Sequence, residues 1–94
     1  MKIFKSEELQ SALQLLHGWT LQGDAIEKKF QFHDFKQALA FIVQVGILAE
    51  QDDHHPEIFN VYNQVKLRLN THSEKAITDK DTNLALKINA LSLS

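Results

Sequence analysis

A chain of 94 residues, of which 44% are hydrophobic and 23% charged, has the composition of one small globular domain and leaves no room for a second core. It contains no cysteine, which excludes disulfides and thiolate zinc sites. The formal net charge of −2 and the pI near 6.2 offer no basic surface for non-specific nucleic-acid binding. We therefore expect residues 1–94 to form a single domain without a nucleic-acid partner, stabilised by packing or self-association.

The chain carries no pattern typical of a secretory signal or a membrane span. The N-terminus becomes acidic at Glu7 and Glu8 before any apolar stretch begins, which argues against an ordinary signal peptide. The longest apolar run, residues 38–49, is interrupted by Gln44 and is too short to cross a bilayer. We expect no membrane association and, by default, a cytoplasmic protein.

The first expected element is a short amphipathic helix over residues 6–16. Ser6 is its expected N-cap, and Gly18 is its expected stop. Acidic residues follow Ser6 in the first turn, where the helix dipole favours negative charge. The apolar positions that recur at helical spacing are Leu9, Ala12, Leu13 and Leu16.

A β-hairpin is expected next, because the Gly23-Asp24 turn signal separates two segments with strand patterns, residues 19–22 and 25–32. Lys28 interrupts the inner stripe, and we expect its stem to reach an edge of the sheet. The residues expected to face the core are Ile26, Phe30 and Phe32. Those expected to face solvent are Glu27, Lys29, Gln31 and His33.

Residues 35–50 predict a central helix that is capped by Asp34 and has apolar residues on two sides. The expected core stripe consists of Phe35, Ala38, Ile42, Val45 and Ala49. A second apolar surface is expected at Phe41, Val43, Ile47 and Leu48. A chain this short has few elements to cover both surfaces, so we expect another subunit to cover the second.

A second strand pair, residues 58–61 and 65–69, and a last helix complete the chain. Thr78 and Asp81 form a variant of the capping box at the start of that helix. The element order is therefore α-β-β-α-β-β-α. This order favours an α+β fold in which helices pack on one face of a four-stranded antiparallel sheet.

The residues best suited to chemistry surround a pair of adjacent histidines. Glu50 ends the central helix, His54 and His55 follow it, and Pro56 restricts the backbone of His55. His72 comes just after the last strand. Imidazole, with an ordinary pKa of about 6.5, exchanges protons near neutral pH. If the last strand runs back beside the turn, three imidazoles and a carboxylate converge, which is enough for the addition or elimination of water.

The spacing Glu50-x3-His54-His55-Pro56-x5-Tyr62-x9-His72-x8-Asp81 resembles the signature of the pterin-4a-carbinolamine dehydratases, with every position filled. The similarity covers nearly the whole chain from Trp19 onward. Further matching segments are Gly18-Trp19, Phe30-x-Phe32-x-Asp34-Phe35, Pro56-Glu57-x-Phe59-Asn60-Val61-Tyr62-Asn63 and Asn83-Leu84-Ala85.

This resemblance implies a hydro-lyase that dehydrates 4a-hydroxytetrahydropterin to quinonoid dihydropterin, in the recycling of tetrahydrobiopterin. The pterin is then the substrate, and no cofactor or metal is implied. The resemblance also implies a homodimer or homotetramer. We expect His54 and His72 to act as the acid/base pair, His55 to bind and polarise the substrate, and Glu50 to orient an imidazole. The substrate contacts implied are His54, His55, Pro56, Thr71, His72, Ser73 and Glu74.

Other interpretations of these residues are open. Without the wider pattern, adjacent histidines in a turn are more often solvated polar residues than catalytic ones. Glu50, His54, His55 and His72 form a tolerable ligand set, but their spacing matches no known metal motif. Asp81 has a sufficient structural explanation in its capping box. Trp19 and Tyr62 are expected to pack, and His17 and His33 are expected to lie outside the site.

Two other functions remain beside the dehydratase. Animal members of the resembled family also serve as dimerisation partners of a homeodomain transcription activator, so a non-catalytic protein-binding role is the alternative. The apolar excess of the central helix is compatible with both self-association and hetero-association. A protein that binds pterin without turnover is the third possibility, but the complete set of histidines argues against it.

Overall fold

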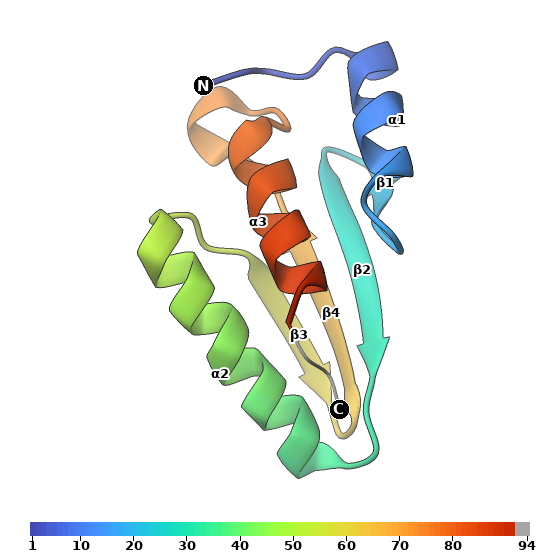
Figure 1. The fold of residues 1–94 in the computed structure, drawn as a ribbon, viewed down its shortest axis with the longest axis vertical. Coiled ribbons are helices and arrows are strands. Elements are labelled where there is room, and N and C mark those ends of the chain that lie inside the picture. Colours follow the sequence, from blue (N-terminus) through green and yellow to red (C-terminus); the bar gives the residue numbers. More distant parts are fainter. Residues whose placement is uncertain (92–94) are drawn as a thin grey trace.

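The computed structural model describes residues 1–91 and has the expected order of elements (Figure 1). A short 3-10 helix, η1, precedes the last helix. The elements are α1 (Ser6–Gln14), β1 (Thr20–Gln22), β2 (Ala25–Gln31), α2 (Phe35–Asp52), β3 (Glu57–Val61), β4 (Gln64–Leu69), η1 (His72–Glu74) and α3 (Asp79–Asn89).

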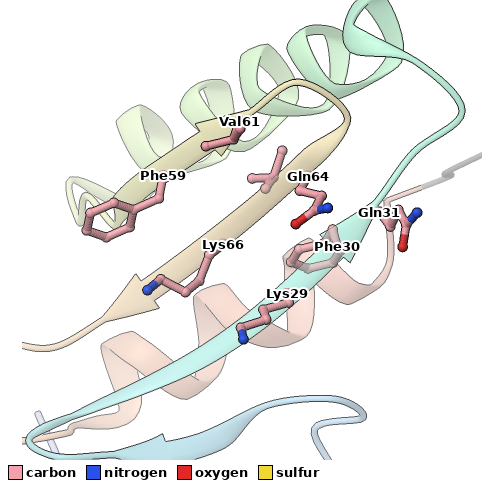
Figure 2. Close-up of a pocket in the computed structure, with 8 residues that line it drawn as sticks. Lys29, Phe30, Gln31, Phe59, Val61, Gln64 and Lys66 are labelled. Carbon is pink, nitrogen blue, oxygen red and sulfur yellow. The ribbon is translucent and has the colours of Figure 1, made fainter.

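The four strands form one antiparallel sheet in the order β1-β2-β4-β3. β2 and β4 are the central pair, aligned so that Phe30 lies opposite Val65. α2 and α3 lie behind the sheet in the view of Figure 2, whereas the side chains in the foreground project from the opposite face. The α+β fold with helices on one face of a four-stranded antiparallel sheet is confirmed.

The hydrophobic core lies between the sheet and the helices. Along β4, Val65, Leu67 and Leu69 are buried, whereas Lys66 and Arg68 point to the other face, as the alternating pattern predicts. The ring of Phe41 on α2 reaches the sheet, with its centroid 4.6 Å from that of Phe30. Burial of this apolar surface is the main force that holds the two layers together.

The rotation of α2 differs from the expected one. Phe41, assigned to the second surface, is 2% exposed, and Phe35, assigned to the core, is 45% exposed. The outward residues recur every four positions, and we name them the α2 apolar stripe: Phe35, Leu39, Val43 and Ile47. The expectation of a second apolar surface is therefore confirmed, but with a different membership. Within residues 1–91, no helix is both long enough and apolar enough to cross a membrane.

Two helix starts follow the predicted capping pattern and one does not. The Asp34 side chain accepts a hydrogen bond from the backbone N–H of Gln37 at 2.9 Å, and Thr78 begins α3 with a capping box. At α1, however, Lys5 and not Ser6 occupies the N-cap. Glu8 accepts from the backbone N–H of Lys5 at 3.2 Å, so the first turn is stabilised without a side-chain hydroxyl.

Lys28 reaches from the inner face of β2 to an edge of the sheet, as expected. Its ammonium donates to the backbone oxygen of His17 at 2.8 Å and to Oδ1 of Asn89 at 2.9 Å. The indole N–H of Trp19 donates to the same Asn89 oxygen at 3.0 Å. Burial lowers the pKa of Lys28. These contacts join the start of the β1–β2 hairpin to the end of α3.

We expect Gly18→Ala and Gly46→Ala to change stability in opposite directions. Gly18 has φ +84°, and an added Cβ there would lie 2.6 Å from Cε of Lys28, so the substitution should cost about 1–2 kcal/mol. An added Cβ at Gly46 within α2 meets nothing, so that substitution should stabilise the protein by about 0.5–1 kcal/mol. Urea unfolding of both variants measures the difference. Equal effects would contradict the conformation described at Gly18.

Candidate active site

His54 is held in a buried pair with Asp81. α2 ends at Asp52, Asp53 adopts the left-handed conformation with φ 50°, and the His54 backbone N–H then donates to the oxygen of Ala49 at 3.0 Å. This turn points the imidazole back toward α3. Nε2 of His54 lies 2.5 Å from Oδ1 of Asp81, and the two side chains are 10% and 0% exposed. The carboxylate therefore fixes the orientation of the ring.

The second oxygen of Asp81 is also fully used. Oδ2 accepts from the backbone N–H of Thr78 at 2.9 Å and from Oγ1 of Thr71 at 2.8 Å. The hydroxyls of Thr71 and Thr78 are themselves 2.8 Å apart. A carboxylate with no exposed surface needs such partners, because burying it alone is costly. One carboxylate thus joins His54, the start of α3 and the segment that follows β4.

His55 and Glu50 form a second pair, which is exposed. Nε2 of His55 lies 2.6 Å from Oε1 of Glu50, and the side chains are 57% and 79% exposed. Glu50 lies in the last turn of α2, and Pro56 follows the histidine directly. The expected contact between Glu50 and an imidazole is therefore present. Its partner is His55, and the ring of His55 is exposed to solvent.

His72 begins η1 and is exposed, directly after the buried Thr71. The hydrogen bond from Thr71 to Asp81 brings this segment next to the His54 pair, and the backbone of Thr71 also bridges to Ala76. Ser73 and Glu74 lie in the same turn and are exposed. Within residues 1–91, no hydrogen bond joins His72 to His54 or His55. The contacts of Asp81 therefore link His54 to the segment that carries His72, whereas the convergence of all three imidazoles with Glu50 stays a prediction.

A small pocket of about 220 Å³ gives access to His54 from the side of α3. Its other lining residues are Asp52, Lys80, Asn83 and Lys87. Nζ of Lys87 lies 2.7 Å from Oδ1 of Asp52, which ties the end of α2 to α3. Sequence reasoning missed the three α3 residues as site residues. Lys80, Asn83 and Lys87 are spaced three and four residues apart, so they lie on one face of the helix. This spacing is the feature of the sequence that could have identified them.

Asp81 was expected to be structural only. The capping box is confirmed, since Oδ2 of Asp81 accepts from the Thr78 backbone N–H. The contact with His54 was not expected, because it joins residues 27 positions apart. The place of Asp81 in the spaced signature was the signal that pointed to it.

Metal binding finds no geometric support in the part of the chain described. Across residues 1–91, no three or more His, Cys, Asp or Glu side chains are grouped so that they could hold an ion. Glu50 and Asp81 each contact a different histidine, and the two pairs do not form one ligand set.

The fold and the site together define a class: a small α+β protein with helices on one face of its sheet and two histidines, each paired with a carboxylate, at the end of its central helix. The family model described as "Pterin 4 alpha carbinolamine dehydratase" matches residues 2–91. The chain belongs to the pterin-4a-carbinolamine dehydratase family.

Individual relatives agree over nearly the full length. A protein named "Putative pterin-4-alpha-carbinolamine dehydratase" from Sulfurisphaera tokodaii is 43% identical over 97% of this chain and 98% of its own. A solved structure from Brucella melitensis, described as a transcriptional coactivator/pterin dehydratase, has a TM-score of 0.89 and 43% identity, and covers 94% of this chain and 96% of its own. Another, described as a pterin dehydratase-like protein that is a RuBisCO assembly factor in the alpha-carboxysome, has a TM-score of 0.68 and 25% identity, over 79% of this chain and 88% of its own.

We expect removal of the two carboxylates to affect stability very differently. Asp81→Ala leaves the Thr78 N–H, the Thr71 hydroxyl and the His54 ring without their buried acceptor, and should cost at least about 3 kcal/mol. Glu50→Ala removes an exposed contact and should cost less than about 0.5 kcal/mol. Urea unfolding of the two variants tests this. A similar cost for both would contradict the buried network.

Proposed function

We propose that this protein catalyses the dehydration of 4a-hydroxytetrahydropterin to quinonoid dihydropterin and water, as a hydro-lyase in pterin recycling. The observation that carries the proposal is the buried pair of His54 and Asp81, at the spacing of a family to which the chain belongs. An imidazole fixed by a buried carboxylate, beside a segment that carries a second histidine, provides the minimum for acid–base chemistry.

The reaction moves two protons and breaks one bond. The bond from C4a to the hydroxyl breaks, and the departing oxygen takes a proton and leaves as water. The proton on N5 is removed, and the electron pair of the broken N5–H bond forms the double bond between N5 and C4a. Both transfers require groups that exchange protons near neutral pH, which is the range of histidine.

Each histidine has a role in this proposal. Because Nε2 of His54 faces Asp81, Nδ1 is the nitrogen left to exchange a proton with the substrate. We assign His54 and His72 as the acid/base pair, and His55, oriented by Glu50, as the group that binds and polarises the pterin. Further substrate contacts are assigned to Pro56, Thr71, Ser73 and Glu74. The pterin is the substrate, and the proposed reaction uses no metal and no cofactor.

The proposal is tested by stopped-flow measurement of 4a-hydroxytetrahydropterin decay. The wild-type protein should accelerate the decay. His54→Ala and His72→Ala should each lower kcat by roughly 10²–10⁴-fold, because each removes one of the two proton-transfer groups. His55→Ala should act mainly on KM, because this residue is assigned to binding.

His33→Ala is the matched control, since His33 is exposed and lies outside the site. It should leave kcat and KM unchanged, and treatment with a chelator should have no effect on the wild type. If the wild-type protein does not accelerate the decay, the proposed enzymatic function is wrong. If the alanine variants retain full activity, the assignment of these residues is wrong, but the proposed function is not contradicted.

We also propose that the α2 apolar stripe mediates self-association into a homodimer or homotetramer. Four apolar side chains, each 43–61% exposed, recur along one side of a single helix. Such a continuous apolar surface is typical of an interaction site. The non-catalytic alternative, a partner protein on the same surface, is suggested by the description of the Brucella melitensis structure as a transcriptional coactivator.

Light scattering after size exclusion measures the oligomeric state. The wild type should have at least twice the monomer mass. Val43→Lys and Ile47→Lys should lower that mass, because each places a charge within the stripe. Leu86→Lys on α3, at a leucine that is 56% exposed, is the control and should leave the mass unchanged. A monomeric wild type at micromolar concentration would contradict the proposal.

A further inference from the structure

The face of the sheet opposite α2 and α3 has two ends with different electrostatics. Alternate residues of β2, β4 and β3 project from it, and Figure 2 labels Lys29, Gln31, Phe59, Val61, Gln64 and Lys66 among them. Near the β1–β2 turn, the guanidinium of Arg68 contacts three carboxylates, with distances of 2.7 Å to Asp24, 2.5 Å to Glu27 and 3.1 Å to Glu57. The Glu27 carboxylate raises the pKa of Arg68. One positive charge among three carboxylates leaves this end of the face with an excess of negative charge.

The other end carries two lysines whose positive charges have no carboxylate in contact among the described residues. Lys29 on β2 lies directly opposite Lys66 on β4 in the strand register. Like charges at directly opposite positions destabilise a sheet. Within residues 1–91, neither ammonium forms an ion pair with a carboxylate, although Arg68, on the same strand as Lys66, has three. Nζ of Lys66 lies 4.7 Å from the centroid of the Phe59 ring.

These lysines border a hollow of about 430 Å³ that is separate from the histidine site (Figure 2). Its lining residues are Lys29, Phe30, Gln31, Phe59, Val61, Gln64, Val65 and Lys66. The volume is in the range of small-molecule sites, roughly 300–1,000 Å³. Phe59 is 51% exposed and Val61 is 77% exposed, so the hollow has an apolar wall. Gln31 and Gln64, opposite each other in the register, add amide donors and acceptors.

We propose that this hollow is a second binding site, for a small aromatic anion of the nucleoside monophosphate class. The phosphate lies between Lys29 and Lys66, where it compensates two adjacent like charges. The flat ring lies against Phe59 and Val61, and the glutamine amides meet its polar edge. Charge complementarity selects this occupant, because an uncharged apolar ligand would leave the lysine pair uncompensated.

Titration of the ¹⁵N-labelled full chain with AMP, followed by NMR, tests the site. Amide shifts should concentrate on β2, β4 and β3 around the hollow. Lys29→Gln and Lys66→Gln should each weaken AMP binding by about two- to fivefold, the usual contribution of one exposed charge pair. Higher ionic strength should weaken it further. Lys36→Gln, at an exposed lysine on α2, is the matched control and should bind AMP like the wild type.

Two other probes separate the parts of the ligand. Adenosine should bind more weakly than AMP, and inorganic phosphate should also bind more weakly. Phe59→Ala should weaken the binding of AMP but not that of phosphate. Unchanged affinity in both lysine variants, or shifts that fall outside the hollow, would overturn the proposal. Equal binding of AMP and phosphate would also overturn it, because the aromatic wall would then contribute nothing. All lysine variants should retain the wild-type decay rate of 4a-hydroxytetrahydropterin.

Discussion

The contacts of the Asp81 carboxylate are the constraint on which the site depends. This side chain is fully buried, so folding must supply it with partners, and it finds them in three separate parts of the chain. It contacts His54 after α2, Thr71 after β4, and the Thr78 backbone at the start of α3. The same carboxylate therefore caps α3 and orients the imidazole of His54. Any displacement of α3 along the sheet would separate His54 from its carboxylate.

The one-sided arrangement of helices divides the molecule into two chemical regions. The helices and the inner face of the sheet bury the apolar residues, and the two histidine–carboxylate pairs lie where α2 ends. The opposite face receives the outward residues of every strand, and the register decides which of them become neighbours. It places Arg68 among three carboxylates and Lys29 beside Lys66. A face of mixed composition thus has one end with an excess of carboxylates and one cationic end.

The order of elements and the class of fold were predictable from the sequence, because local signals carried them. The alternation along β4, the Gly23-Asp24 turn, and the Asp34 and Thr78 caps depend on residues a few positions apart. The family signature was equally accessible, since it is a matter of residue type and spacing. One local prediction was wrong. Ser6 is a better capping residue than Lys5, but Lys5 is the N-cap of α1 and Glu8 accepts the hydrogen bond from its backbone N–H.

Only the tertiary structure decided which face of α2 is buried and which groups meet at the site. Apolar residues on two sides of α2 leave only a narrow polar face to fix its rotation, so packing against the sheet buried Phe41 and left Phe35 exposed. The partner of His54 lies 27 residues away and is set by the packing of α3 on the sheet. Sequence determined the kinds of groups that were available. Packing decided their pairing, because contacts between distant segments depend on how all the layers fit at once.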